Sequence, residues 1–330
     1  MLIQGGIKML LRSLYKSKAL RSCLSFAAVF MVMGFLTGQA SAVKEKQKTF
    51  ASPEKAMKAL VDAVKKNNDK ELAAIFGLGS QGLVSSGDKV DDKVRRERFL
   101  KTYEEKNSIE SEGEGKAVLH IGNQDYPFPI PMLKNKNAWY FDTKEGKEEI
   151  LCRRLGRNEL NVMDVLHAYT DAQREYASRD RNNDGAKEFA QKLISSKGKK
   201  DGLYWEVKEG EEESPFGPLI AKAAKEGYAG KIKNDKSEPY HGYYFRILKS
   251  QGKNAEGGAF DYIVKGHMIL GFGLVAYPAK YGSSGVMTFI VNQEGKIYEK
   301  DLGKNTNKAA TITKYDPDKT WKKDEEAVKK

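Results

Sequence analysis

The stretch 157-RNELNVMDVLHAYTDAQREYAS-178 decides the fold of the C-terminal half of this 330-residue chain. Its apolar residues recur at helical spacing and fall on one face: Val162, Val165, Leu166, Tyr169, Ala172 and Tyr176. The stretch therefore predicts a long amphipathic helix with one face against a core. Because strand-like runs dominate after it, with no alternating strand–helix–strand pattern, we expect this helix to pack on an antiparallel sheet.

The rest of the C-terminal half places short apolar runs between glycine-containing turns, a pattern typical of antiparallel hairpins. The runs expected to form strands are Tyr243–Leu248, Phe260–Val264, Ile269–Tyr277, Val286–Val291 and Lys296–Asp301. Residues 180–230 are expected to be an acidic, glycine-rich loop region that holds one short helix, Pro218–Lys225. We therefore predict a domain over residues 157–316 and a charged tail over residues 317–330, frayed from Lys322 on.

The N-terminal half has helices first and strands afterwards. Ser52 and Pro53 are residue types typical of a helix cap and first turn, and an apolar stripe at i, i+3, i+4 and i+7 follows them. Further helices are expected over 69–76, 89–106 and about 145–155, and strands over 117–121, 126–133 and 138–142. The predicted fold class is α+β, with helices plus an antiparallel hairpin forming a domain over residues 50–155 and a boundary at Gly156.

The first 42 residues show the order of features of a secretory signal peptide. A basic stretch precedes an apolar run from Cys23 to Leu36, and Gln39-Ala40-Ser41-Ala42 supplies a small-residue cleavage site before Val43. The apolar run has about 14 residues, and a spanning helix needs roughly 20, which disfavours the alternative of an uncleaved anchor. We expect export to the periplasm or the exterior, no stable membrane span after cleavage, and a charged leader over residues 43–49.

The charge balance argues against a nucleic-acid partner. Of the 57 Lys and Arg residues, five lie in the predicted signal, which leaves 52 against 45 Asp and Glu in the mature chain. Lysines alternate with glutamates along most of the chain, whereas a nucleic-acid groove needs clustered basic residues with aromatic residues between them. The sequence therefore predicts no nucleic-acid binding.

The sharpest local motif is Asp180-Arg-Asn-Asn-Asp-Gly185. Asp180, Asn182 and Asp184 stand at positions 1, 3 and 5 of a calcium loop, and glycine stands at position 6, where such loops turn sharply. Glu188 at position 9 adds a further oxygen donor, but position 12 is a glutamine where calcium loops carry a bidentate glutamate. We expect a weak calcium site at Asp180, Asn182, Asp184 and Glu188. The alternative is an Asx-rich connector that caps a helix ending at about residue 193.

No catalytic constellation stands out in the mature chain. The four histidines, His120, His167, His241 and His267, lie far apart in sequence and none has a metal-ligand spacing. Asp261 and His267 could be combined with Ser283 or Ser284 as a hydrolase triad, but the serines stand between strands and not at a strand-to-helix turn. We predict no catalytic residues, and His241, His267, Asp261 and Ser284 are the residues whose convergence would revive an enzyme.

Several longer runs are similar to a known bacterial family. They are Tyr240–Leu248, Gly266–Ala279 and Tyr281–Gly303, with the shorter Phe128–Pro131, Trp139–Thr143 and Arg154–Glu159. Together they resemble the exported family catalogued as domain of unknown function 2950, over nearly the whole mature chain. The resemblance implies export and a shared fold, and it implies no particular activity.

A second resemblance concerns the C-terminal half. The helix after Arg157, with Tyr169 and Tyr176, and the runs Gly242–Phe245 and Gly285–Ile297 look like the soluble part of type IV pilins and pseudopilins. That resemblance implies one long helix packed on an antiparallel sheet. It does not extend to the apolar half-helix through which pilins polymerise, since residues 147–154 are mostly charged. The first domain is similar to cystatin-like α+β cones, which is a resemblance of fold alone.

The sequence therefore predicts an exported protein of the cell envelope that acts as a non-enzymatic binding or assembly module. The expected partner is an envelope protein or a glycan, and calcium is the one candidate cofactor. Aromatic residues from Tyr240 to Tyr281 would supply either the core of the sheet or a sugar- or peptide-binding face. The alternative function is a periplasmic hydrolase that acts on an envelope substrate.

Overall fold

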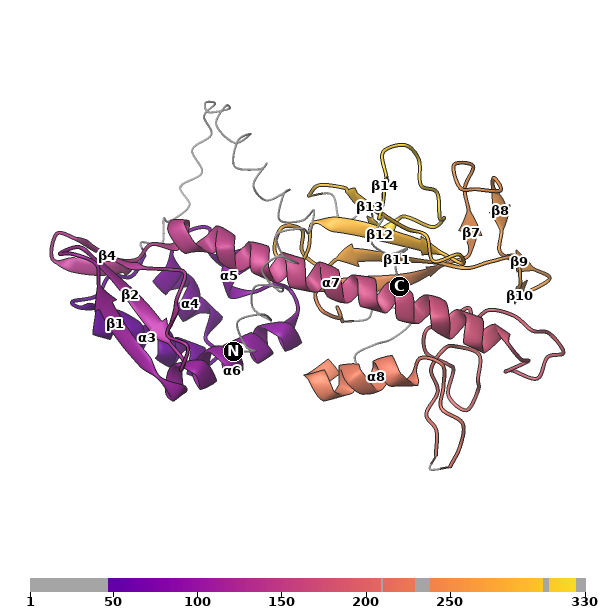
Figure 1. Ribbon diagram of the computed structural model, residues 1–330, viewed down its shortest axis with the longest axis horizontal. Helices are drawn as coiled ribbons and strands as arrows, with labels where there is room; N and C mark the ends of the chain where they lie inside the picture. Colours follow the sequence, from indigo (N-terminus) through magenta and orange to yellow (C-terminus); the bar gives the residue numbers. More distant parts are fainter. Residues whose placement is uncertain (1–46, 209, 229–237, 305–308, 325–330) are drawn as a thin grey trace, which may run out of the picture. The chain divides into compact units, whose positions relative to one another are not determined.

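The computed structural model describes residues 47–208, 210–228, 238–304 and 309–324 (Figure 1). The predicted signal peptide, residues 1–42, and most of the predicted leader lie outside these ranges. The chain divides into two compact units between Gly156 and Arg157, and each unit has a hydrophobic core of its own. Within the described ranges, no helix combines the length and apolarity needed to cross a membrane.

Within residues 47–156, the described part of the N-terminal unit, four helices come first: α3 (Pro53–Lys65), α4 (Asp69–Phe76), α5 (Gln81–Val84) and α6 (Lys89–Glu105). Side-chain caps fix where the first two start, since Ser52 accepts a hydrogen bond from the Lys55 N–H and Asn68 accepts one from the Glu71 N–H. The predicted apolar stripe of α3 is buried, with Met57 and Leu60 each 2% exposed. Helices α3, α4 and α6 start and end close to their predicted positions, and the one-turn helix α5 was not predicted.

An antiparallel sheet completes the N-terminal unit: β1 (Asn107–Ser111), β2 (Lys116–Ile121), β3 (Tyr126–Pro127), β4 (Met132–Asn135) and β5 (Ala138–Phe141). The strand order is β1-β2-β4-β5, and β3 pairs with β2. The strand predicted over 126–133 is interrupted between β3 and β4, where Pro129 and Pro131 cannot donate hydrogen bonds to a ladder. The expected hairpin into β5 is present, with Asn135 paired to Ala138.

The long helix α7 (Thr143–Ala177) is continuous across Gly156. The sequence predicted two helical stretches with a boundary at this glycine, whereas the structure places the division between the units inside an unbroken helix. Gly156 has helical geometry, and a side chain built on it would meet no atom within 4 Å. A glycine within a helical pattern is therefore no sufficient sign of a helix end.

In its described residues, the C-terminal unit adds α8 (Gly217–Ala223), the π-helical turn η1 (Ala224–Tyr228) and nine strands. The main sheet has the antiparallel order β14-β13-β12-β11-β6, formed by β6 (Tyr243–Leu248), β11 (Gly273–Pro278), β12 (Met287–Asn292), β13 (Ile297–Asp301) and β14 (Lys322–Lys323). Two small ribbons pair β7 (Ser250–Gln251) with β8 (Phe260–Asp261), and β9 (Ile263–Val264) with β10 (His267–Met268). The runs predicted as strands over 260–264 and 269–277 are thus divided or displaced, and the others are present.

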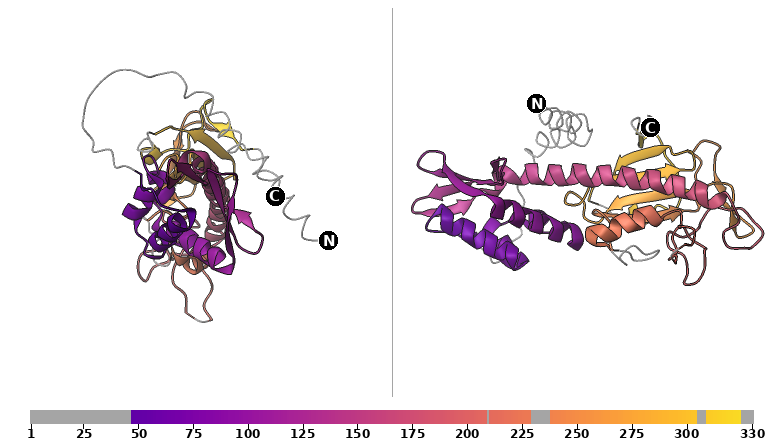
Figure 2. Two further views of the ribbon diagram at one scale, coloured as in Figure 1. Left: turned by 90° about the vertical axis from the view of Figure 1, so that its left-hand side faces the viewer. Right: turned by 60° about the horizontal axis from the view of Figure 1, so that its bottom comes forward.

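The buried face of α7 packs on this sheet, as Figures 1 and 2 show for the C-terminal unit. Leu274 and Ala276 of β11 point to the helix side, while Val275 between them joins a second cluster on the opposite face. Tyr315 and Trp321 contribute to that second cluster, and Lys322 and Lys323 pair with β13. The predicted charged tail therefore begins inside the folded part, because its aromatic residue and its last described residues cover the sheet. Both units combine helices with antiparallel strands, which confirms the α+β class.

Candidate metal centre

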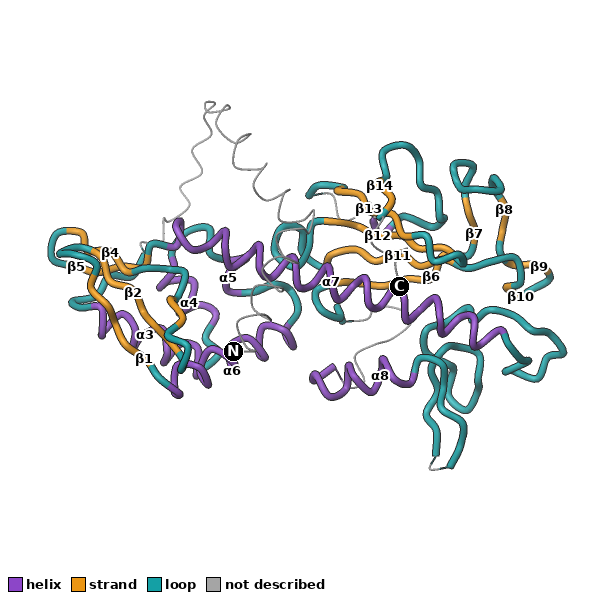
Figure 3. Tube along the Cα trace, in the orientation of Figure 1, coloured by secondary structure: helices purple, strands orange, loops and turns teal. Residues whose placement is uncertain are grey.

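The described residues between α7 and α8 form no helix or strand (Figure 3), and the first of them are the predicted calcium loop. The Asp180 carboxylate accepts hydrogen bonds from the backbone N–H groups of Asp184, at 3.3 Å, and Gly185, at 2.9 Å. Gly185 has a φ of +90°, which glycine adopts without strain. Asp180 thus folds the backbone of the loop. The helix that the alternative interpretation expected up to residue 193 is not formed, since residues 185–193 are described and non-helical.

Three other residues of the motif come together. The Asn182 side-chain N–H₂ donates to Asp184 Oδ2 at 2.6 Å and to Glu188 Oε1 at 2.8 Å. Glu188 is 8% exposed, and its Oε2 accepts the backbone N–H of Met268 at 3.1 Å. The predicted donors Asn182, Asp184 and Glu188 therefore surround one point, and Asp180 is occupied elsewhere.

The fold holds this part of the loop against the long helix. Gln173 of α7 bonds both backbone groups of Ala190, since its Nε2 donates to the carbonyl and its Oε1 accepts the N–H, each at 2.8 Å. The loop is also held to the β9–β10 hairpin, because the Phe189 N–H donates to the Met268 carbonyl at 2.8 Å. These bonds flank Glu188 and fix its position against β10.

The β9–β10 hairpin adds His267, a candidate ligand that the sequence motif does not contain. Its Nδ1 lies 3.5 Å from Asp184 Oδ2 and 3.6 Å from Glu188 Oε2. One ligand atom from each of Asp184, Glu188 and His267 lies within 4.8 Å of the others, which is a spacing that a single metal ion can bridge. The imidazole comes from a strand some 80 positions further along the chain, so loop spacing could not reveal it.

The polar atoms of this cluster are not all satisfied by protein groups. Asn182 Oδ1 and His267 Nδ1 are buried atoms that have no hydrogen-bond partner within the described part of the chain. Desolvation raises the pKa of Asp184, but hydrogen bonds from the Ala186 N–H and the Asn182 amide, with the nearby His267, outweigh it and lower the pKa overall. Asp184 is therefore ionised at neutral pH and is available as a metal ligand.

A cavity of about 350 Å³ adjoins the cluster, and Asp184, Glu188 and His267 are among its lining residues. Lys249 and Lys265 line it as well. The candidate ligands thus face a space that is large enough for a small molecule and that has positive charge at its edge.

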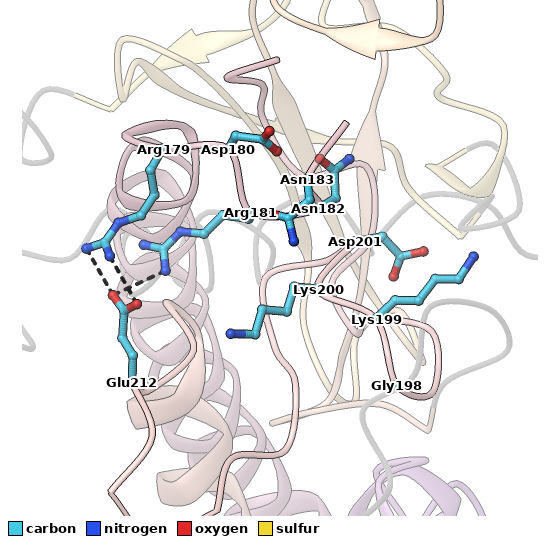
Figure 4. Close-up of a pocket in the computed structure, with 10 residues that line it drawn as sticks. All are labelled: Arg179, Asp180, Arg181, Asn182, Asn183, Gly198, Lys199, Lys200, Asp201 and Glu212. Atoms are coloured by element: carbon cyan, nitrogen blue, oxygen red, sulfur yellow. Dashed lines mark hydrogen bonds and ion pairs between the residues drawn. The ribbon is translucent and has the colours of Figure 1, made fainter. Parts of the chain in front are cut away.

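A second cavity of about 670 Å³ shares Asn182 and Asp201 with the first one (Figure 4). Here Arg179 and Arg181 converge on Glu212, at 3.0 and 3.2 Å. The Arg181 side chain is only 3% exposed, so this is a buried charge that Glu212 balances. The arginines of this cavity are therefore paired already, and we assign it no ligand.

The residues of the hydrolase alternative have separate partners. Ser284 is fully buried, and its hydroxyl bonds the backbone N–H and carbonyl of Lys280. His241 Nε2 lies 2.9 Å from Glu226 Oε2, while His267 faces Asp184 and Glu188. A serine in this position is closed off from substrate, so the triad considered from the sequence is not assembled around it.

The aromatic residues of the C-terminal strands belong to the core. Tyr243, Tyr262 and Phe272 are fully buried, and Tyr240 is 4% exposed. Tyr244, Phe245, Tyr277 and Tyr281 are half-buried. This distribution favours the core interpretation over an open sugar- or peptide-binding face.

Comparison with known proteins gives one result. No curated protein and no solved structure matches the chain, and the likeness to pilins and to cystatins gains no support from them. A family model described as a protein of unknown function (DUF2950) matches residues 47–324, from the first described residue to the last. The resemblance expected from the sequence is thereby confirmed, and the chain belongs to the DUF2950 family.

Proposed function

We propose that this protein is an exported, non-enzymatic binding module of the cell envelope, and that its C-terminal unit binds a divalent cation at Asp184, Glu188 and His267. The observation that carries the proposal is the convergence of three ligand atoms, one per residue, within 4.8 Å of one another. Export is supported by the basic, apolar and small-residue order of residues 1–42. An envelope protein or glycan remains the proposed partner of the module.

The loop motif predicts calcium as the ion bound here, with oxygen donors from four residues, Asp180, Asn182, Asp184 and Glu188. Asp184 and Glu188 supply two carboxylates, and Asn182 would supply its oxygen if its amide were turned, since the N–H₂ group lies 2.6 and 2.8 Å from those carboxylates. Calcium takes six to eight oxygen ligands, so water would have to fill the remaining positions and the affinity would be low, in the millimolar range.

Titration calorimetry on the chelator-treated mature protein tests cation binding, with calcium and zinc as separate titrants. We expect heat of binding from at least one ion, and its loss in Asp184→Asn and Glu188→Gln. Asp171→Asn is the matched control, because it removes one carboxylate from a side chain of α7 that is 79% exposed. If neither ion binds, or if the control loses binding as the two ligand variants do, the cation site is excluded.

Export is tested separately. When the full chain is produced in a Gram-negative host, N-terminal sequencing of the exported protein should begin at Val43. Material that begins at Met1 would overturn the proposed processing and leave the cation site unaffected.

We also propose that each unit shares its fold, and no more than its fold, with a known class of domain. In the C-terminal unit, α7 packs on a five-stranded antiparallel sheet, which is the arrangement expected of a pilin-like soluble domain. In the N-terminal unit, helices pack against an antiparallel sheet, as in cystatin-like cones. A crystal structure whose strand connections match neither class would remove this proposal.

A further inference from the structure

We propose that the cation site selects a zinc-class transition ion over calcium, and that an anionic ligand in the adjoining cavity completes its coordination. This inference rests on the proposed cation binding and names the ion and the ligand class. It is carried by His267, which brings a nitrogen donor to a site that the sequence motif describes with oxygen donors alone.

The distances at His267 fit a bridging ion better than a hydrogen bond. Nδ1 lies 3.5 Å from one carboxylate oxygen and 3.6 Å from another, whereas an N–H···O hydrogen bond spans about 2.7–3.2 Å. Two ligands on a tetrahedral zinc ion, with bonds of about 2.1 Å, lie about 3.4 Å apart. The separation between the imidazole nitrogen and each oxygen is therefore close to the edge of a zinc coordination tetrahedron.

His120 shows that a histidine between two carboxylates is not enough. Its Nε2 lies 3.3 Å from Glu110 and its Nδ1 lies 3.3 Å from Asp125. Because the two ring nitrogens point in diverging directions, those carboxylates lie on different sides of the ring and cannot share one ion with it. At His267, by contrast, a single nitrogen faces both oxygens. Convergence on one atom is what distinguishes the proposed site.

The type of donor selects the ion. Imidazole suits zinc, copper, nickel and iron, whereas calcium takes a full set of oxygen ligands, and the carboxylates here number two. The supporting contacts are those of a zinc site, in which ligating carboxylates are themselves hydrogen-bonded. Glu188 Oε2 accepts the Met268 N–H, and the two Asp184 oxygens accept the Ala186 N–H and the Asn182 amide. The ligands are thus oriented before any ion arrives.

The number of ligands leaves one position open. Zinc sites with three protein ligands keep a fourth position for water or another ligand, and here all three protein ligands line the cavity of about 350 Å³. Lys249 and Lys265 line the same cavity, so an anion there would be attracted both by the ion and by the ammonium groups. We therefore assign to the cavity a small ligand with a carboxylate or phosphate group.

The test uses cobalt as a spectroscopic substitute for zinc. The chelator-treated mature protein is titrated with Co²⁺, which should give the intense visible absorption of a four-coordinate site, and zinc should displace it. Acetate and inorganic phosphate are then added separately, and at least one should shift the cobalt spectrum. His267→Ala should weaken zinc binding by about tenfold or more, while the matched variant His120→Ala leaves it unchanged.

Each outcome separates the two proposals. Calcium binding that is stronger than zinc binding, or zinc binding that His267→Ala leaves unchanged, overturns the inference while the cation site stands. If neither acetate nor phosphate changes the cobalt spectrum, the proposal that an anion completes the coordination is wrong. If His267→Ala does not fold, as judged by circular dichroism, His267→Gln replaces it, because glutamine keeps a polar side chain of similar length on β10 and removes the imidazole nitrogen. Absence of binding by all ions overturns both proposals.

Discussion

The hydroxyl of Tyr243 lies 3.4 Å from Oε1 of Glu159, and both side chains are buried between α7 and the sheet. The same carboxylate oxygen accepts the backbone N–H groups of Val286, at 3.0 Å, and Met287, at 3.2 Å. Burial raises the pKa of Glu159, although these hydrogen bonds act in the opposite direction. Glu159 thus joins the first part of α7 in the C-terminal unit to the start of β12.

Replacement of Glu159 should lower the free energy of unfolding, and by less when the new side chain can still accept hydrogen bonds from the Val286 and Met287 N–H groups. Glu159→Ala removes the acceptor of two partly buried N–H groups and should cost about 1–3 kcal/mol, whereas Glu159→Gln keeps an acceptor and should cost about 1 kcal/mol or less. Urea denaturation of the two variants and the wild type gives the comparison. Equal losses in both variants would show that the hydrogen bonds to β12 contribute little.

The raised pKa of Glu159 gives this residue a pH dependence of known sign. Above its ordinary value of 4.5, the folded protein retains a proton that the unfolded chain has released. The contribution of Glu159 to stability is therefore full below pH 4.5 and declines as the pH rises through the folded-state pKa. Relative to Glu159→Gln, which does not titrate, the wild type should lose stability over this window. Parallel unfolding curves at increasing pH measure the difference, and a constant difference would contradict it.

Gly285 is required by its contact with Tyr243. A Cβ atom at this position would lie 2.0 Å from the Tyr243 hydroxyl oxygen, and the tyrosine is fully buried and cannot withdraw. Gly285→Ala should therefore cost about 1–3 kcal/mol through overpacking. Tyr243→Ala in the same chain removes the hydroxyl, Cζ and Cε2 atoms, which would lie 2.0, 2.3 and 2.5 Å from that Cβ, so the two substitutions together should cost less than the sum of their separate effects. Additive effects of the two substitutions in a double-mutant cycle would argue against this contact.

Much of this fold could be predicted because burial leaves a periodic trace in the sequence. The apolar stripe of α7 and the apolar runs of β6 and β12 predict these elements, and they contain residues that are buried in the structure. Strand β1 gave no such trace, since of Asn107–Ser111 only Ile109 is part of the core and the remaining residues are exposed. Its position depends on pairing with β2, which local sequence does not encode.

The candidate site could be predicted only in part, for a similar reason. The loop motif revealed Asn182, Asp184 and Glu188 because their spacing is local. It assigned Asp180 to the same role, although that carboxylate bonds backbone N–H groups of the loop. His267 could not be added from the sequence, because only the hydrogen bonds between the loop and β10 bring it to Glu188. Contacts between distant segments decide the chemistry of this site.

Two glycines of α7 should respond to alanine with opposite signs. Gly156→Ala meets no atom within 4 Å and should raise the free energy of unfolding by about 0.5–1 kcal/mol, because alanine favours a helix interior. Gly146→Ala would place its Cβ 2.0 Å from the Pro129 carbonyl oxygen and should be destabilising. Thermal unfolding followed by circular dichroism measures both. Destabilisation by Gly156→Ala would indicate that the helix is broken at this residue.

Zinc should stabilise the chelator-treated protein in proportion to the logarithm of its free concentration. An ion that binds only the folded state adds about 2.7 kcal/mol at a hundred times its Kd, and about 1.4 kcal/mol for each further tenfold increase. Once zinc is in excess, a higher Kd leaves this slope unchanged and shifts the dependence to higher zinc concentration, whereas loss of binding removes the dependence. Glu188→Gln and His267→Ala should flatten the slope or displace it to much higher zinc concentrations.

Asp180→Ala should lower the stability without zinc and keep the slope, because Asp180 bonds the loop backbone. A melting temperature that zinc does not change in the wild type, or a slope that Asp180→Ala abolishes as Glu188→Gln does, would contradict the assignment of Asp184, Glu188 and His267 as the ligands.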